Sequence, residues 1–253
     1  MAPSVPVVVD RGAGGVATIT IANPSKRNAL PVEGWRLIPS LLADLDADPS
    51  VWVIVLTGEG DHFSSGLDLS SLGDDAATIS AAEIGAVTAP AEAALIACSK
   101  PVIARIRGYC VGGGVLLAAA CDLRVAASDA QLGITPAKLG IVYPQPSIDR
   151  LVALTSPGFA KRMLLTAEIV PVARAAAAGL VDDVVDPTEL DAAVDALIER
   201  MRPLSKLTIS AAKQMIDGTA AVDWPALSRS SGEQAEGVAA FLAHRPPTFP
   251  WAP

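Results

Sequence analysis

The chain has 253 residues, of which 51% are hydrophobic and 18% are charged, with a net charge of −8 at pH 7. This length fits one large domain, or one domain with a C-terminal appendage, and supplies enough apolar residues for a sizeable core. The acidic balance argues against nucleic acid as a partner, and no apolar run is long enough to predict membrane insertion.

The first predicted elements are a β-hairpin and an amphipathic helix. Residues Val5–Val9 and Val16–Ile21 are expected to form the hairpin, because threonine and isoleucine alternate along the second strand. Residues Pro31–Ala47 are predicted to be helical. Their large apolar side chains recur at helical spacing on one face, at Trp35, Ile38, Leu42 and Leu45.

The middle of the chain alternates between strands and helices. Residues Val51–Thr57 are a β-branched run, which is typical of a strand buried on both faces. The Ala-rich segment Ala81–Cys98 predicts a helix that ends before Pro101. A further strand is expected at Pro101–Arg107, and Gly113–Ala120 should begin a buried helix after three glycines.

Short strands are predicted next, at Asp122–Ala127 and Gln131–Gly133, and the pattern becomes mostly helical beyond Ser147. A short β-like segment at Leu180–Val185 interrupts it. The last three helices are expected at Glu189–Met201, Ser205–Ile216 and Pro225–His244. This order predicts an α/β core over residues 1–195 and a helical C-terminal region over residues 196–253.

The cysteines and histidines do not form a metal-binding pattern. Cys98, Cys110 and Cys121 lack Cys-x-x-Cys spacing, and the two histidines are far apart in sequence. We therefore predict no metal site. The odd number of cysteines and the lack of a signal peptide fit a reducing compartment, so we expect a cytoplasmic protein.

Two glycine-containing turns, His62–Leu69 and Arg107–Gly114, give the strongest functional signal, and each follows a predicted strand. Two such turns can direct backbone N–H groups at one oxygen atom, which is how an oxyanion hole stabilises a developing negative charge. Gly113 also opens a predicted helix, where N–H groups are free and the helix dipole favours negative charge.

Five segments match a known set of motifs in order. They are Asn23–Leu30, Phe63–Leu69, Gly108–Gly114 with the following Cys121-Asp122, Ala178–Val181 and Phe241–Pro247. In this order and spacing they resemble the motifs of the crotonase superfamily, also called the enoyl-CoA hydratase/isomerase family. The resemblance covers about residues 16–249, which is nearly the whole chain.

The resemblance implies a spiral of repeated ββα units, with C-terminal helices that drive assembly into a homotrimer or a dimer of trimers. The implied ligand is an acyl-CoA thioester, with coenzyme A as part of the substrate and no separate cofactor. The thioester oxygen would accept hydrogen bonds from the backbone N–H groups of Leu67 and Gly113. Ser65, Gly66 and Asp68 are expected to line the substrate site, although Asp68 alternatively caps local amides.

Three basic side chains are candidates for holding coenzyme A. Lys26 and Arg27 lie in the first motif, and Lys213 lies on a predicted C-terminal helix. In this family such a helix can approach the ligand of a neighbouring subunit. For each of the three, the alternative is an ordinary solvated charge.

The sequence departs from the family where acid–base catalysis is expected. Hydratases of this family use two glutamates, which should lie at positions 116 and 136, but this chain has Leu116 and Pro136. Both residues are expected to line the substrate pocket without acid or base function. A positioned acid or base is worth roughly 10²–10⁴-fold in rate, so ordinary hydratase activity should be weak or absent.

Tyr143 is the best remaining polar candidate. It ends Thr135–Tyr143, a segment that resembles the corresponding part of the family's methylmalonyl-CoA decarboxylases. Loss of CO₂ itself leaves a thioester enolate, so this reaction needs no base. The alternative for Tyr143 is a half-buried tyrosine bonded to a backbone carbonyl.

Three functions therefore stay open. The first is an enolate-forming lyase, with a malonyl-type decarboxylase as its most specific version. The second is a non-catalytic acyl-CoA carrier or sensor, which would suit the apolar Leu116 and Pro136. The third is a hydratase or isomerase in which a carboxylate from elsewhere, such as Glu83 or Glu92, reaches the site.

Overall fold

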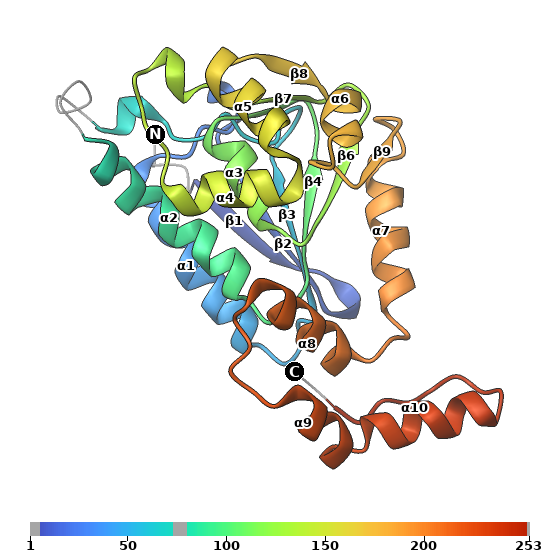
Figure 1. Cartoon of the computed structure of the whole chain (residues 1–253). Helices are drawn as coiled ribbons and strands as arrows, with labels where there is room; N and C mark the ends of the chain where they lie inside the picture. Colours follow the sequence, from blue (N-terminus) through green and yellow to red (C-terminus); the bar gives the residue numbers. More distant parts are fainter. Residues whose placement is uncertain (1–5, 73–79, 252–253) are drawn as a thin grey trace.

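A six-stranded sheet forms the centre of the protein in a computed structural model, which describes residues 6–72 and 80–251 (Figure 1). The strand order is β1-β2-β3-β4-β6-β9. β1 pairs with β2 antiparallel, and all the other neighbours are parallel. The bounds are β1 Val7–Arg11, β2 Val16–Ile21, β3 Val53–Gly58, β4 Val102–Ile106, β6 Leu123–Ala127 and β9 Asp183–Val185.

A second sheet contains three short strands, β5 Tyr109–Val111, β7 Gln131–Gly133 and β8 Ile169–Pro171. β5 follows β4 and leads into α3 (Gly113–Ala120), while β7 follows β6 and leads to α4 (Gln145–Leu154). These are the ββα units expected from the resemblance. Each unit places a helix N-terminus or a polar loop close to the end of a strand, and this arrangement builds the site.

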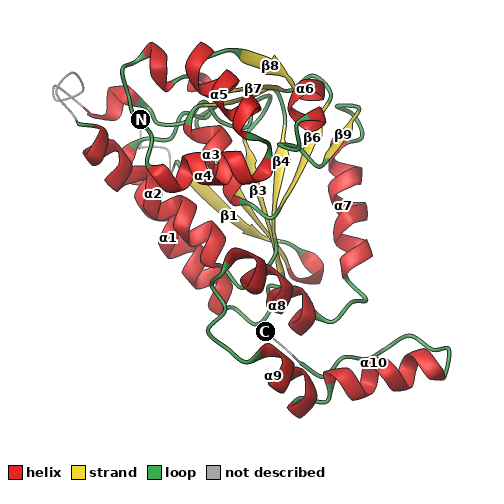
Figure 2. Cartoon of the chain, viewed as in Figure 1, coloured by secondary structure: helices red, strands yellow, loops and turns green. Residues whose placement is uncertain are grey.

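Helices cover both faces of the large sheet (Figures 1 and 2). The side chains of β3 alternate, so that Ile54 and Leu56 join the main core with α1 to α3, while Val53 and Val55 pack on α7. A strand buried on both faces was expected here and is confirmed. The bounds of the other helices around this sheet are α1 Val32–Ala47, α2 Ala81–Ala97, α5 Pro157–Thr166, α6 Val172–Ala177 and α7 Leu190–Met201.

The C-terminal region differs from the sequence prediction. The single helix expected at Pro225–His244 is two helices, α9 Trp224–Ser230 and α10 Glu233–Leu242, because Gly232 adopts a left-handed conformation with φ +84° between them. The boundary expected after residue 195 falls inside α7. Figure 1 shows α8 (Lys206–Asp217) beside the core, with α9 and α10 reaching away from it.

Two further observations complete the fold. Within residues 6–72 and 80–251, no helix is long and apolar enough to cross a membrane. The three cysteines are buried and unpaired, as expected for small apolar side chains. Val5, the expected start of the first strand, lies outside the described residues.

Candidate functional site

The two glycine-containing turns lie against each other and are joined by backbone hydrogen bonds. Ser64 donates its N–H to the Tyr109 carbonyl at 3.1 Å, and Val111 donates to the Ser64 carbonyl at 2.8 Å. The Ser64 hydroxyl accepts from the Gly66 N–H at 3.0 Å. This short ladder fixes the first turn on β5, immediately before the residues predicted to bind the thioester oxygen.

The direction of the Leu67 N–H follows from its neighbours. Leu30 donates to the Gly66 carbonyl at 2.7 Å, and the Asp68 N–H donates to the Leu30 carbonyl at 2.8 Å. In a parallel bridge of this pattern the residue between the two bonded groups directs its own N–H to the opposite side. The Leu67 N–H therefore points away from Leu30.

Gly113 supplies the second donor as the first residue of α3, where N–H groups have no partner within the helix. Gly66 has φ +89°, and a Cβ at position 66 would lie 2.6 Å from the Gly113 nitrogen. The two turns therefore meet at Gly66 and Gly113. Among the described residues, neither the Leu67 N–H nor the Gly113 N–H has a hydrogen-bond acceptor. Two free backbone donors, one of them at a helix N-terminus, have the chemistry of an oxyanion hole.

Asn28 stabilises the loop that leads to this site. It was not identified as a functional residue from the sequence. Its side chain is fully buried, with φ +56°. The amide nitrogen donates to the carbonyls of Glu59 at 2.9 Å and His62 at 2.6 Å, and the amide oxygen accepts from the Asn23 N–H at 3.0 Å. Asn28 therefore holds both ends of the loop that leads to Leu67.

The predicted coenzyme A residues of the first motif lie beside the same turn. Lys26 binds the Asp68 carboxylate at 2.7 Å, and the Ser65 hydroxyl donates to the Lys26 carbonyl at 3.1 Å. Burial acts to raise the pKa of Asp68, but hydrogen bonds from Lys26 and Ser70 hold it below its ordinary value. Arg27 places its guanidinium 4.6 Å from the centre of the Tyr109 ring. Both cations are exposed and can meet an anionic ligand.

Leu116 and Pro136 are both buried and apolar. Leu116 lies in the first turns of α3, close in sequence to the Gly113 donor, and Pro136 begins a 3₁₀ turn that ends at Lys138. Neither side chain can donate or accept a proton. The site therefore has no acid or base at the two positions where the sequence resemblance would place glutamates.

Tyr143 lies close to the Gly112–Gly113 turn. A Cβ at Gly112 would lie 3.6 Å from the Tyr143 hydroxyl, and Gly112 is fixed by its N–H bond to the Gly133 carbonyl at 2.8 Å. Tyr143 also lines a cavity of about 340 Å³ together with residues of α2, namely Ala82, Gly85 and Ala89. Burial, and then the carboxylate of Glu92, raises the pKa of the tyrosine, so its hydroxyl stays protonated near neutral pH.

The two glutamates considered as substitutes occupy different environments. Glu83 is exposed and forms a capping box with Ser80 at the start of α2. Glu92 is 6% exposed, and one of its carboxylate oxygens accepts from the Ser147 hydroxyl at 2.8 Å. Burial raises the pKa of Glu92 to about 7, against the opposing effects of Ser147 and Arg150.

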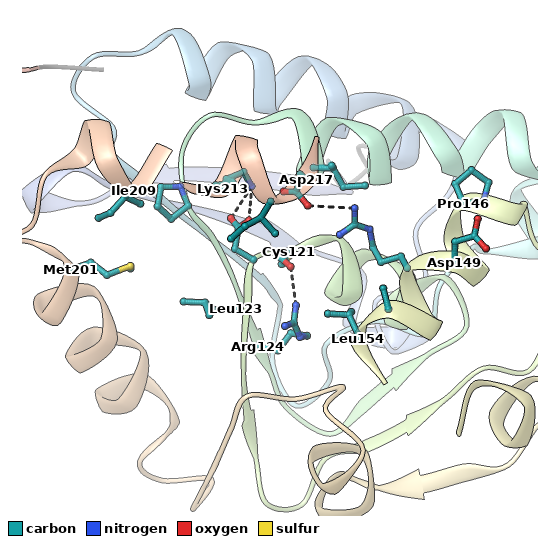
Figure 3. A pocket seen from close by; sticks show the side chains of 16 residues that line it. Cys121, Leu123, Arg124, Pro146, Asp149, Leu154, Met201, Ile209, Lys213 and Asp217 are labelled. Carbon is teal, nitrogen blue, oxygen red and sulfur yellow. Dashed lines mark hydrogen bonds and ion pairs between the residues drawn. The ribbon is translucent and has the colours of Figure 1, made fainter. Parts of the chain in front are cut away.

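Lys213 lies elsewhere, beside a cavity of about 820 Å³ at the other end of α3 (Figure 3). Its ammonium group is buried and binds both carboxylate oxygens of Asp122, at 2.7 and 2.8 Å, and the Leu95 carbonyl at 3.1 Å. α3 has eight residues, so its two ends lie roughly 12 Å apart. Within one chain the structure brings Lys26 and Arg27 to the first turn but not Lys213, whose approach to the ligand of a neighbouring subunit stays a prediction.

The arrangement so far is a pair of free backbone donors, with the Tyr143 hydroxyl close to Gly112 and a cavity on the α2 side of the tyrosine. Within the described part of the chain, no cluster of three or more His, Cys, Asp or Glu side chains could hold a metal ion. The sequence model of the family described as enoyl-CoA hydratase/isomerase matches residues 11–249. The chain belongs to this family.

Relatives and solved structures agree with this assignment. The chain is 32% identical to a crotonyl-CoA hydratase of Syntrophomonas wolfei over 92% of its own length and 94% of the relative. It is 33% identical to a peroxisomal Δ(3,5)-Δ(2,4)-dienoyl-CoA isomerase of Arabidopsis thaliana, in a match that covers 91% of each chain. A crystal structure of an enoyl-CoA hydratase/isomerase family protein from Hyphomonas neptunium aligns with TM-score 0.86, 36% identity and coverage of 98% and 99%.

Membership of the enoyl-CoA hydratase/isomerase family confirms the crotonase fold and the enzymatic family expected from the motifs. It also agrees with an acyl-CoA thioester as the ligand class. The two named relatives are a hydratase and an isomerase, so these names do not support the local resemblance to decarboxylases. The reaction of this member must be argued from its own residues.

Proposed function

We propose that the protein binds an acyl-CoA thioester with its carbonyl oxygen between the N–H groups of Leu67 and Gly113, and that it stabilises the enolate there. The proposal is carried by the meeting of the two turns at Gly66 and Gly113, together with the lack of a protein acceptor for either donor among the described residues. Lys26 and Arg27 beside the first turn are suited to the phosphates of coenzyme A.

The reaction that requires the fewest further groups is loss of CO₂ from a malonyl-type CoA ester. The C–C bond to the carboxylate breaks, its electron pair moves into the enolate, and the thioester oxygen carries the negative charge. No base is needed, which agrees with the apolar Leu116 and Pro136. The Tyr143 hydroxyl beside Gly112 is placed to supply a proton to the enolate carbon.

A second candidate reaction is the isomerisation of an unsaturated acyl-CoA, which moves one proton between two carbons of the acyl chain. The observation that favours it is the buried Glu92 beside the Tyr143 segment. A single acid/base group can remove a proton from one carbon and return it to another. Water addition through two glutamates has no such support at positions 116 and 136.

A panel of CoA esters separates these functions. Methylmalonyl-CoA and ethylmalonyl-CoA should release CO₂ if the protein is a decarboxylase, and 3-enoyl-CoA should convert to 2-enoyl-CoA if it is an isomerase. Tight calorimetric binding without turnover of any ester would identify a carrier or sensor. Crotonyl-CoA hydration at the rate of an ordinary hydratase would contradict our interpretation of Leu116 and Pro136, and absence of binding would refute the whole proposal.

Tyr143→Phe should lower the turnover of a malonyl-type ester by roughly 10²–10⁴-fold, because the variant loses a positioned proton donor. The ring remains, so the affinity for the ester should change little. Steady-state kinetics and calorimetry of the same variant measure the two quantities. Unchanged turnover would leave Tyr143 as a half-buried tyrosine that lines the pocket.

The assembly state is a further part of the proposal. Apolar side chains are exposed on the C-terminal helices, at Ile216 on α8 and at Val238, Phe241 and Leu242 on α10. Such faces suit subunit contacts. The family resemblance implies that the assembly is a homotrimer or a dimer of trimers, and sedimentation of the full chain measures this directly. The cytoplasmic location stays a prediction from the sequence.

A further inference from the structure

We propose that Glu92 is the acid/base residue of this site, exchanging a proton with the acyl chain from the α2 wall of the pocket. It would replace the groups that Leu116 and Pro136 cannot supply. This inference rests on the proposed function, because it requires an acyl-CoA whose thioester oxygen is held by Leu67 and Gly113. It adds to that function the residue that transfers the proton. Leu116 and Pro136 take no part in this step.

Only one of the two carboxyl oxygens of Glu92 has a hydrogen-bond partner among the described residues. Oε2 accepts from the Ser147 hydroxyl at 2.8 Å, whereas Oε1 is buried and has no hydrogen-bond partner among the described residues. A buried, unpartnered carboxylate oxygen is costly to a fold, since such groups are almost always bonded. A ligand that enters the pocket would provide the missing contact.

The position of Glu92 on α2 relates it to the cavity beside Tyr143. Ala82, Gly85 and Ala89 line the cavity beside Tyr143, and their spacing of three and four residues defines one face of the helix. Glu92 follows three residues later on the same face. Its carboxylate contributes to raising the pKa of Tyr143, whose hydroxyl lies next to the Gly112–Gly113 turn. Glu92 therefore lies on the face of α2 that lines this cavity, one turn beyond Ala89, and the Tyr143 hydroxyl stands between the cavity and the Gly112–Gly113 turn.

The proposed step is a balanced proton transfer. The Glu92 carboxylate takes a proton from a carbon of the acyl chain, and the C–H bonding pair moves into the enolate held at Leu67 and Gly113. The protonated Glu92 returns the proton to the same carbon, or to another carbon in conjugation with it.

Deuterium exchange tests the step with a simple acyl-CoA, so the natural substrate need not be identified first. Butanoyl-CoA is incubated with the full-length protein in D₂O, and incorporation at the carbon next to the thioester is followed by mass spectrometry and NMR. Glu92→Gln should slow the exchange by about 10²-fold or more. Glu83→Gln is the matched control, because it lies on the same helix and glutamine preserves the capping box. That control should exchange at the wild-type rate.

The outcomes distinguish the two proposals. Slow exchange in Glu92→Gln, with unchanged butanoyl-CoA affinity by calorimetry, supports Glu92 as the acid/base residue. Equal exchange rates in Glu92→Gln and the wild type would overturn the role of Glu92 but not the proposed oxyanion hole. Binding of butanoyl-CoA to the wild type without any exchange would also overturn the role of Glu92. If the wild type fails to bind butanoyl-CoA and longer acyl-CoA esters, the proposed function itself is wrong.

The pH dependence of the same proteins gives an independent readout. The groups facing Glu92 among the described residues are Ser147 and Arg150 on α4, with Asp217 beyond the arginine, and Tyr143 in the preceding loop. Exchange requires the carboxylate, so the wild-type rate should rise as the pH passes about 7 and then level off. Glu92→Gln should show no such rise.

Thermal unfolding supplies the last comparison. Because the folded protein raises the pKa of Glu92 from 4.5 to about 7, the carboxyl group stabilises the fold at low pH and this contribution is lost between those values. Glu92→Gln should therefore gain melting temperature relative to the wild type from pH 5 to pH 8. A variant less stable by the same amount at every pH would show that folding does not raise the pKa of Glu92, which would contradict the protonation state that the proposal assigns to it.

Discussion

Gly66→Ala should reduce turnover of any CoA ester by at least about 10²–10³-fold. The added Cβ would lie 2.6 Å from the Gly113 nitrogen and 3.2 Å from the Val111 carbonyl oxygen. These contacts are with backbone atoms, so the neighbours cannot rotate away and the two turns must separate. Loss of one oxyanion donor costs about 2.7–4 kcal/mol in activation free energy, and each 1.36 kcal/mol is tenfold in rate.

The matched control for this substitution is Gly60→Ala in the same loop. Gly60 also has a positive φ, +68°, but a Cβ there would meet no atom within 4 Å. Both variants therefore carry similar backbone strain, and only Gly66→Ala disturbs the donors. Kinetics of turnover and the exchange of butanoyl-CoA in D₂O measure the difference. Equal activity losses in the two variants would show that the contact of Gly66 with Gly113 does not form the catalytic centre.

The parts of the site that the sequence predicted are those defined by short-range motifs. The helix that begins at Gly113 was predicted correctly, because a helix N-terminus at a run of glycines is a local feature with a local signal, whereas the roles of Gly66 and Gly113 at the site stay predictions. The long strands and helices were also predicted, since their hydrophobic periodicity extends over many residues. The short strands β5 and β8 were missed, because β5 lies inside the glycine-containing turn Arg107–Gly114 and β8 lies in a stretch whose overall pattern is helical.

The parts that the sequence could not define depend on contacts between distant segments. α2 carries alanines on every side, so its pattern does not mark the buried face and cannot separate Glu92 from Glu83. Lys213 was considered as a cation for coenzyme A, but its burial by α2 and β6 is a property of the folded chain. The break at Gly232 was hidden within an apparently continuous helical pattern, because a glycine inside a helix is unfavourable but tolerated.

Lys213→Met should lower the free energy of unfolding by about 3 kcal/mol, the lower end of the cost of breaking a buried ion pair. The lysine side chain is 5% exposed and that of Asp122 is 22% exposed, and both residues line the cavity of about 820 Å³. Asp122 also accepts the Val102 N–H at 2.6 Å, at the start of β4. The variant would leave this carboxylate buried without its cation, and α8 would lose its bond to the Leu95 carbonyl.

Lys26→Met shows how much of this loss of stability depends on burial, because the two ion pairs have the same N–O distance. Lys26 and Asp68 also meet at 2.7 Å, but the lysine is 50% exposed, and exposed pairs contribute only about 0–1 kcal/mol. Chemical denaturation of both variants measures the two costs, and Lys213→Met combined with Asp122→Asn should recover part of the larger one. At temperatures where Lys213→Met is folded, its affinity for butanoyl-CoA should equal that of the wild type, whereas weaker binding would return Lys213 to the ligand site. A loss of stability no larger than that of Lys26→Met would mean that the carboxylate of Asp122 reaches water through the cavity, so that burial adds nothing to this pair.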